Sequence, residues 1–305
     1  MKILHIVPGT DDGTNGMVVV ANLLAKEQGE AEVVDLKDSL RTLRFCDSAL
    51  NTTVEVWVHG MWLPREWLAC WRALKAGKRL VRMTHGSLSP LYLRHQSPFK
   101  KWLVGPIERF LLLRCAKIIA TCEAEAEWIR AYEPRVKSIE ITDIKRFFKL
   151  VSGGVRSGGV EEIKNPQLST SNSQLHLLYL GRRHPLKGVE YLETAVRQIK
   201  KGSAPLRLCA RIISNAFGEE KDKVWEWCDV LVLPTLSDNF GLVIAEALER
   251  GKHVITTDGA PAWGDGTDYG GRLVYLKGYR DGEPKRKVEL LRNAIEQVGS
   301  YLTKA

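Results

Sequence analysis

The sequence predicts an α/β protein of two doubly wound, Rossmann-like domains that face a cleft. Its 305 residues are enough for two domains of ordinary size. Short apolar runs alternate with helical patterns in both halves, as in parallel sheets with right-handed crossovers. A stretch rich in Gly and Ser, 151–174, separates the halves and predicts a linker. We therefore expect domains over residues 1–150 and 175–305, with the last helix a candidate to pack back onto the first domain.

The individual elements follow from the spacing of apolar residues, which repeats every three to four positions in helices and forms short continuous runs in buried strands. In the first half, the expected strands are 3–7, 32–35, 54–59, 79–84 and 117–121, and the expected helices are 17–27, 67–75, 99–115 and 123–132. In the second half, the expected strands are 175–180, 206–213, 230–233 and 254–257, and the expected helices are 189–200, 221–227 and 240–249. The helix 99–115 carries an apolar stripe, and Pro106 is expected to kink or restart it. The stripe consists of Phe99, Trp102, Leu103, Ile107, Phe110 and Leu111.

The net charge of +9 is concentrated in one segment, 72–117. This segment contains eleven basic residues and a single acid, Glu108. The eleven are Arg72, Lys75, Lys78, Arg79, Arg82, Arg94, Lys100, Lys101, Arg109, Arg114 and Lys117. Such a field favours an anionic partner, such as phospholipid headgroups, a phosphorylated glycan or nucleic acid, although a solvated surface explains it equally well. Nucleic acid is the weakest of these partners, because no recognised nucleic-acid module or aromatic stacking pattern appears.

The chain is expected to be cytoplasmic, with peripheral contact to the inner face of the membrane through residues 72–117. No apolar run approaches the roughly 20 residues that cross a bilayer, and the N-terminus lacks the pattern of a signal peptide. The six cysteines show no metal-ligand spacing, which indicates reduced thiols and no metal site.

The strongest chemical signal is the string 230–251, which reads as a strand, a loop, a helix and a glycine stop. Asp238 lies in the loop, Phe240 and Gly241 lie at the helix entrance, and Glu246 lies within the helix. Unpaired amides and the positive dipole end of a helix favour an anion at such an entrance. A plain strand–helix–strand unit with Asp238 as the N-cap is the alternative interpretation.

This string resembles the retaining GT-B glycosyltransferases of family 4, the group 1 enzymes of bacterial lipopolysaccharide and capsule synthesis. Their hallmark is a Glu, seven residues and a second Glu around a Phe-Gly, and here Asp238 replaces the first Glu. The resemblance implies that Asp238 contacts hydroxyls of the donor sugar and that Glu246 holds the ribose. The amides near Phe240, Gly241 and Leu242 would lie against the sugar and the phosphates.

A second match is the loop 180–188, which resembles the family's Gly-Arg-x-x-x-x-Lys-Gly sequence. The resemblance implies that Arg182 and Lys187 bind the diphosphate. Departure of a nucleoside diphosphate builds negative charge, and two fixed cations stabilise that charge without a metal. Solvated charge at a helix start is the alternative interpretation.

The first half matches as well, through 84–90 and 120–127, which resemble a pattern common in bacterial polysaccharide glycosyltransferases. His85 is then expected to face the cleft near the donor sugar, although a lone histidine is more often structural. Gly13 and Gly16 resemble the family's glycine-rich loop, which approaches the donor phosphate and the acceptor. The acids Glu123, Glu125 and Glu127 are expected to form a mostly solvated helix start.

The sequence therefore predicts a metal-independent, retaining transfer of a hexose-type sugar from a nucleoside diphosphate, expected to be UDP, to a glycan or lipid-linked glycan hydroxyl. No cofactor other than this donor is expected. Two segments depart from the family pattern: 133–174 lacks a clear strand, and 206–229 is short where the nucleobase pocket is expected. A degenerate relative that binds sugar nucleotide or glycan without turnover is the alternative.

Overall fold

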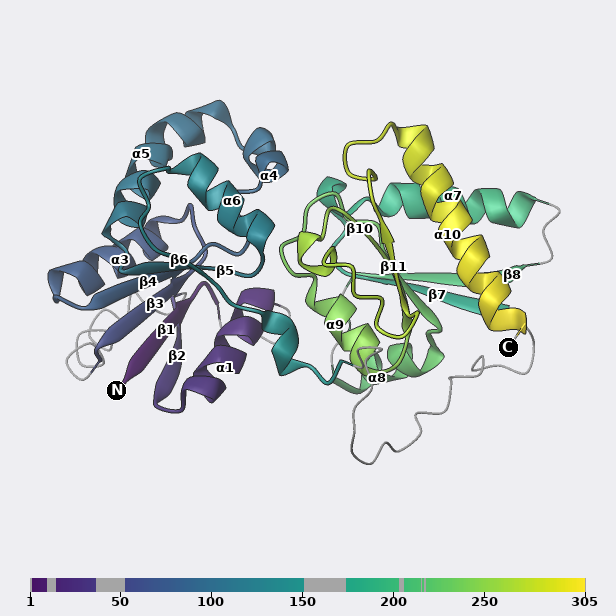
Figure 1. The fold of residues 1–305 in the computed structure, drawn as a ribbon, viewed down its shortest axis with the longest axis horizontal. Coiled ribbons are helices and arrows are strands. Elements are labelled where there is room, and N and C mark those ends of the chain that lie inside the picture. Colours follow the sequence, from purple (N-terminus) through teal and green to yellow (C-terminus); the bar gives the residue numbers. More distant parts are fainter. Residues whose placement is uncertain are drawn as a thin grey trace. The chain divides into compact units, whose positions relative to one another are not determined.

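The computed structural model describes residues 2–9, 15–36, 53–150, 174–202, 206–214, 216 and 218–304 (Figure 1). The chain divides into two compact units, Met1–Phe147 and Phe148–Ala305. Gly13 and nearly all of the expected linker lie outside the described residues. Each unit has the doubly wound, Rossmann-like α/β architecture that the sequence predicts.

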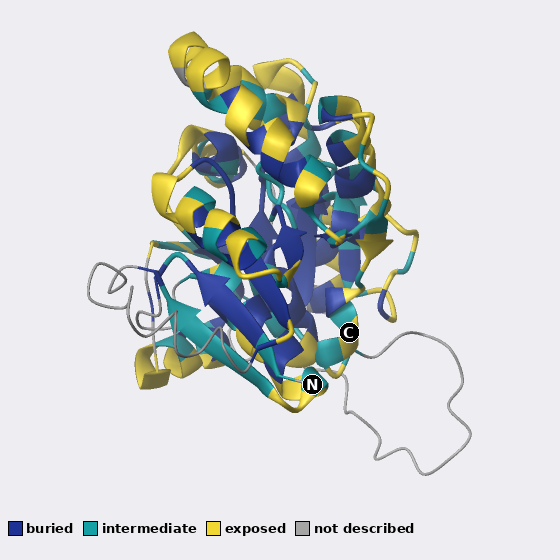
Figure 2. Cartoon of the chain, turned by 90° about the vertical axis from the view of Figure 1, so that its left-hand side faces the viewer, coloured by how far each residue is buried: buried dark blue, intermediate teal, exposed yellow. Residues whose placement is uncertain are grey.

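The first unit is built on a six-stranded parallel sheet in the order β2-β1-β3-β4-β5-β6. Its strands are β1 Ile3–Val7, β2 Ala31–Asp35, β3 Glu55–His59, β4 Arg79–Met83, β5 Lys117–Ala120 and β6 Ile139–Ile141. Its helices are α1 Gly16–Gln28, α3 Pro64–Lys75, α4 Pro90–His95, α5 Pro98–Arg114 and α6 Glu123–Tyr132, followed by the 3-10 turn η1 Ile144–Phe147. All five residues of β3 are buried, because helices cover both faces of a parallel sheet (Figure 2).

Two details of this unit differ from the sequence prediction. β6 occupies part of the segment in which no clear strand was expected, because a three-residue edge strand with two exposed residues carries little apolar pattern. α5 continues through Pro106 from Pro98 to Arg114 without a restart.

The second unit is built on a five-stranded parallel sheet in the order β11-β10-β9-β7-β8. Its strands are β7 Gln174–Leu180, β8 Arg207–Ile213, β9 Val230–Leu233, β10 His253–Thr257 and β11 Leu273–Leu276. Its helices are α7 Val189–Lys201, α8 Gly218–Trp227, α9 Leu242–Glu249 and α10 Pro284–Lys304, with the 3-10 turns η2 Pro185–Lys187 and η3 Pro261–Trp263. The last helix, α10, packs on α7 of its own unit. Gly299 allows α10 to lie close to the start of β8, because a Cβ there would lie 2.7 Å from the Leu206 side chain.

Both sheets have the same winding, which decides where a ligand can bind. In each unit the first strand lies between the second and the third, so the chain reverses its direction across the sheet at β1/β3 and at β7/β9. Ligands of doubly wound sheets bind at the carboxyl ends of the two strands that flank this switch point. In the second unit these ends carry the loops 181–188 and 234–241.

Folding brings carboxylates next to several cations of the basic segment 72–117 and offsets their charges locally. Arg82 is fully buried and pairs with the equally buried Glu108 at 2.8 Å. The other paired residues, with their carboxylate partners, are Arg79 with Glu55, Arg109 with Glu133 and Lys117 with Glu140. These three acids lie outside the basic segment in sequence.

Candidate active site

The two loops at the switch point of the second unit are joined through one carbonyl. The carbonyl of Leu186 accepts hydrogen bonds from the amides of Leu236, at 2.8 Å, and Ser237, at 3.2 Å. It also accepts one from the Thr235 hydroxyl, at 3.1 Å. The loops therefore form one element, and the side chains that they carry are held in a fixed relation.

Gly188 permits this close approach of the two loops. Its φ is +62°, and a Cβ at this position would lie 2.2 Å from the Pro234 carbonyl oxygen. Only glycine satisfies both the left-handed backbone and the lack of space. The close approach of the two loops thus explains why the Gly-Arg-x-x-x-x-Lys-Gly loop ends in glycine.

Lys187 and Asp238, which the sequence assigned to the diphosphate and the donor sugar, form a direct ion pair. Their side chains are 18% and 22% exposed, so both remain accessible. The amide of Asp238 donates to the Gly259 carbonyl at 2.8 Å, which fixes the loop. Asp238 does not cap α9, because the N-cap residue is Gly241 and no side chain accepts a capping hydrogen bond from the helix. The alternative interpretation of Asp238 as a helix cap is therefore wrong.

Arg182 is an exposed cation of the same element. Its carbonyl accepts a hydrogen bond from the Tyr179 hydroxyl at 2.8 Å, which holds the backbone of the loop. Its neighbours are engaged locally, since Arg183 pairs with Glu193 at 2.5 Å and His184 accepts from the Leu186 amide. Among the described residues, no carboxylate pairs with the Arg182 guanidinium. Arg182 is thus free to bind an anion.

At the start of α9, the Phe240 side chain packs in the core, and the backbone amides that follow are the groups that can bind a ligand. The Phe240 ring is 4% exposed and lies 5.2 Å from the Trp263 ring and 6.3 Å from the Phe148 ring, between ring centres. The Trp263 indole N–H donates to the Phe240 carbonyl. Phe240 therefore packs in the core. Gly241, with φ of +66°, is the N-cap of α9. The first two amides of the helix, those of Leu242 and Val243, precede the first hydrogen bond, which runs from the Ile244 amide to the Gly241 carbonyl.

Glu246 lies on α9 and pairs with Lys221 of α8, with 2.7 Å between Nζ and Oε2. Both side chains are about one-quarter exposed, at 23% and 27%. Sequence reasoning missed Lys221, because no motif marks it. A ribose that hydrogen-bonds Glu246 would meet this cation as well. The segment 206–229, which the sequence analysis describes as short where the nucleobase pocket is expected, contains β8 and α8.

We expect Glu246→Gln to weaken binding of a nucleoside diphosphate by about 1–3 kcal/mol, because the ribose hydroxyls lose a charged hydrogen-bond acceptor. A 2′,3′-dideoxy nucleotide should bind wild type and variant alike in calorimetric titrations. The control is Glu249→Gln, which changes an exposed carboxylate on the same helix. Equal losses for both ligands would mean that Glu246 acts structurally.

In the first unit, His85, in the loop after β4, ends a chain of three histidines that begins at His5 of β1 and continues through His59 of β3. His5 Nδ1 lies 2.9 Å from His59 Nε2, and His59 Nδ1 lies 2.9 Å from His85 Nε2. At the other end, His5 Nε2 lies 2.7 Å from the Gln28 side-chain oxygen. That oxygen only accepts, so His5 Nε2 carries a proton, and one proton per contact then leaves His85 Nδ1 as an acceptor. The sequence showed the three histidines but not their contact.

The loop that carries His85 is held in a strained conformation by a buried acid. His85 has a φ of +50°, which is unusual for a residue other than glycine. Glu125 of α6 accepts four hydrogen bonds of 2.6–2.8 Å, from the Thr84 hydroxyl, the Gly86 amide, and the amide and hydroxyl of Thr121. The expectation of a solvated Glu125 is wrong, because these donors from two strand ends bury it completely.

Burial keeps the three histidines neutral, which leads to a prediction about pH. It lowers the pKa of His5 to about 4, and the pKa values of His59 and His85 also lie well below 6.5. The unfolded chain takes up protons near pH 6.5 and the folded chain does not, so stability is lost as pH falls from about 6.5 toward 4. His5 alone should cost about 2 kcal/mol at pH 5 relative to pH 7.

Urea unfolding at pH 7 and pH 5 measures this loss. His5→Gln should reduce the difference between the two pH values, whereas His95→Gln, at an exposed histidine of α4, should leave it unchanged. A wild-type stability that does not change between these pH values would contradict the buried neutral chain.

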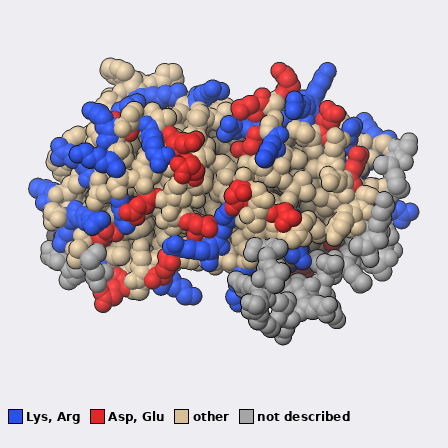
Figure 3. All heavy atoms as spheres, in the orientation of Figure 1, with Lys and Arg blue, Asp and Glu red and all other residues tan. Residues whose placement is uncertain are grey.

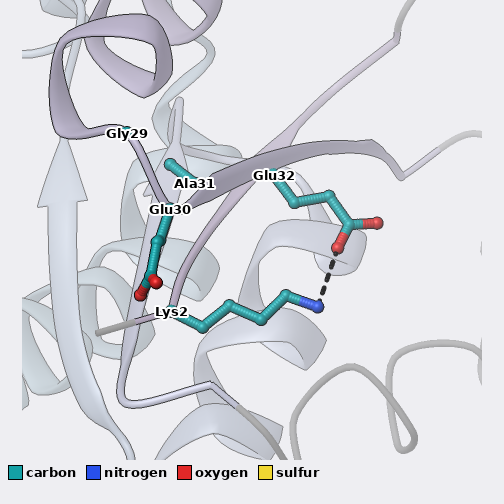
Figure 4. A pocket seen from close by; sticks show the side chains of 5 residues that line it. All are labelled: Lys2, Gly29, Glu30, Ala31 and Glu32. Carbon is teal, nitrogen blue, oxygen red and sulfur yellow. Dashed lines mark ion pairs between the residues drawn. The ribbon is translucent and has the colours of Figure 1, made fainter.

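The remaining site candidate and a further cavity lie elsewhere. Gly16 is the first residue of α1, next to the N-cap Asn15. A cavity of about 600 Å³ lies at the amino ends of β1 and β2, where Lys2 and Glu32 form an ion pair of 3.3 Å (Figure 4). It lies at the edge opposite the switch point, so we do not assign it to the donor. Within the described residues, no group of His, Cys, Asp and Glu could hold a metal ion.

Comparisons with known proteins identify the class of molecule that carries these loops. A family model described as "Glycosyl transferase 4-like domain" matches residues 16–141, and one described as "Glycosyl transferases group 1" matches residues 174–275. Two Rossmann-like units with these matches define a glycosyltransferase of the GT-B type. The chain belongs to the group 1 glycosyltransferase family, whose models together match about three-quarters of its length.

Solved structures share the fold at low sequence identity. Sucrose-phosphate synthase from Thermosynechococcus elongatus matches with a TM-score of 0.66 and 14% identity, over 100% of this chain and 92% of that one. Anabaena HepE in complex with UDP matches with 0.61 and 17%, over 99% and 92%. The lipopolysaccharide outer core galactosyltransferase WaaB matches with 0.55 and 15%, over 100% and 95%. No curated protein sequence matches significantly.

Proposed function

We propose that this glycosyltransferase moves a hexose-type sugar from UDP to a hydroxyl of a glycan or lipid-linked glycan, with retention at the anomeric carbon and without a metal. The observation that supports this proposal most strongly is that Arg182, Lys187 and Asp238 lie on the two loops at the switch point of the second sheet. UDP as the nucleotide is supported by a similar structure solved with UDP, and the acceptor by the similar outer core galactosyltransferase. Lipopolysaccharide or capsule synthesis is the corresponding setting.

Each residue of the site then has a chemical role. Arg182 and Lys187 neutralise the charge that grows on the leaving diphosphate, which is the main electrostatic demand of the reaction. The first amides of α9, next to Gly241, add hydrogen-bond donors and the positive helix end. Asp238 orients the sugar hydroxyls, and Glu246 accepts from the ribose. The role of His85 near the donor sugar stays a prediction.

A transfer assay with a panel of UDP-hexoses and glycan acceptors tests the proposal. UDP release should require both substrates, persist in EDTA, and give a product whose anomeric configuration by NMR matches that of the donor. Inversion, or loss of activity in EDTA, would contradict it. UDP binding without release in any combination would support a degenerate binder, an alternative that rests on the short segment 206–229.

A further inference from the structure

One side of α5 exposes large apolar side chains to solvent. Trp102 is 75% exposed and Phe99 68% exposed. Together with the other exposed residues they form the α5 face, which consists of Phe99, Trp102, Leu103, Ile107 and Phe110. Spacings of three and four residues place them on one side of the helix. The opposite side packs against the unit through Glu108, Leu111 and Leu112, which are buried.

This amount of exposed apolar surface is unusual for a protein that stays free in water. The neighbouring helix α3 adds Leu68 and Trp71, which are 42% and 56% exposed. Within the described residues, Tyr301 is the one exposed large apolar side chain of the second unit. The exposed apolar surface is thus concentrated on the first unit, which indicates a partner for this side.

Cations without acidic partners lie around the α5 face. Among the described residues, no carboxylate pairs with Lys75, Arg94, Lys101 or Arg114. The Arg114 guanidinium lies over the Phe110 ring, 4.7 Å from its centre. Figure 3 shows Lys and Arg side chains, in blue, around uncharged surface at the upper edge of this unit.

A pocket of about 470 Å³ opens beside the face and combines cations with aromatic walls. Lys101, Trp102 and Arg109 line it from α5, and Trp62 and Tyr132 from other elements. Arg109 lies 4.5 Å from the centre of the Tyr132 ring and pairs with Glu133 at 3.6 Å. Aromatic rings next to cations suit the boundary between headgroups and acyl chains.

We propose that the α5 face docks on an anionic phospholipid bilayer. The helix lies in the plane of the interface with its apolar residues below the headgroups, and Lys101 at the mouth of the pocket contacts a lipid phosphate. Helices that lie in an interface have this composition, with aromatic and aliphatic residues on one side and Lys and Arg beside them. A second copy of the chain fits less well, because two like faces would bring their cations together.

Vesicle co-sedimentation tests this docking without nucleotide, so its outcome is separate from the fate of the donor site. The probes are phosphatidylcholine vesicles with and without about one-third phosphatidylglycerol, at about 0.1 M and about 0.5 M salt. The apolar variant is Phe99→Ser, Leu103→Ser and Phe110→Ser, with Tyr301→Ser as its control. The charge variant is Lys101→Glu and Arg114→Glu, with Lys200→Glu and Lys201→Glu as its control.

Wild type and both controls should bind the anionic vesicles, more weakly at high salt. The apolar variant should lose about tenfold or more in partition coefficient at both salt concentrations, and the charge variant should lose its preference for anionic vesicles. An apolar variant that binds like wild type would overturn the proposal in favour of simple electrostatic adsorption. The proposal would be overturned in favour of self-association if the wild type did not bind vesicles and formed a dimer in sedimentation velocity, while the apolar variant was monomeric.

Discussion

Asp238→Asn is expected to lower the single-turnover rate of sugar transfer by about 10²–10³-fold, while UDP affinity stays the same or increases. The two effects separate because Asp238 has two partners. In the structure it pairs with Lys187. In the proposed complex it holds the transferred sugar, and this contact strengthens at the transition state. The asparagine variant loses that contact, but it also releases Lys187 for the diphosphate.

The controls for this prediction exploit the structure. Asp222→Asn changes an exposed carboxylate of α8 and should keep the wild-type rate. Asp238→Glu should keep partial activity, because it restores the residue that the family has at this position. Rapid-quench single-turnover measurements with the true donor decide the matter, and an undiminished rate for Asp238→Asn would remove Asp238 from the reaction.

Lys187→Ala is expected to produce the largest loss of nucleotide affinity. Removing a charge-assisted hydrogen bond to the diphosphate costs about 1–3 kcal/mol, and Arg182→Ala should cost about as much. Lys187→Ala should exceed this, because it also leaves the Asp238 carboxylate unpaired beside the phosphates. Turnover should fall further than affinity in both variants, since negative charge increases as the diphosphate leaves.

A double-mutant cycle isolates the contribution of the ion pair. Adding Asp238→Asn to Lys187→Ala should recover part of the lost UDP affinity, which would appear as a coupling energy between the two positions. Arg183→Ala is the matched control, because this neighbouring guanidinium is engaged by Glu193. Strictly additive effects would show that the ion pair between Lys187 and Asp238 does not influence UDP affinity. Wild-type affinity in Lys187→Ala would show that the loop does not bind the diphosphate.

Most of the fold could be predicted from the sequence, because buried parallel strands read as short apolar runs between helical patterns. The family resemblance also selected Arg182, Lys187 and Asp238, which the structure gathers in one joined element. The pairing of Lys187 with Asp238 could not be predicted, since 51 residues separate them. The same holds for Lys221 and Glu246, which are 25 residues apart.

Other features needed the tertiary structure. Glu125 lies in the first turn of a helix, where acids are usually solvated, and only the donors from two strand ends explain its burial. The sequence predicted the apolar stripe of α5, but it did not predict that most of this stripe faces solvent and not the core. The helix is apolar on its buried side as well, at Leu111 and Leu112, so periodicity alone could not decide which side faces the core.

Hydrogen–deuterium exchange of the intact protein with and without saturating UDP tests the central claim most directly. If the second unit binds the donor through its switch-point loops, UDP should slow exchange in residues 181–188, in 236–242 and in the first turn of α9. Lys187→Ala should lose this protection at the same UDP concentration, whereas Arg183→Ala should keep it. Unchanged exchange in both loops at saturating UDP, or protection confined to the first unit, would contradict the account.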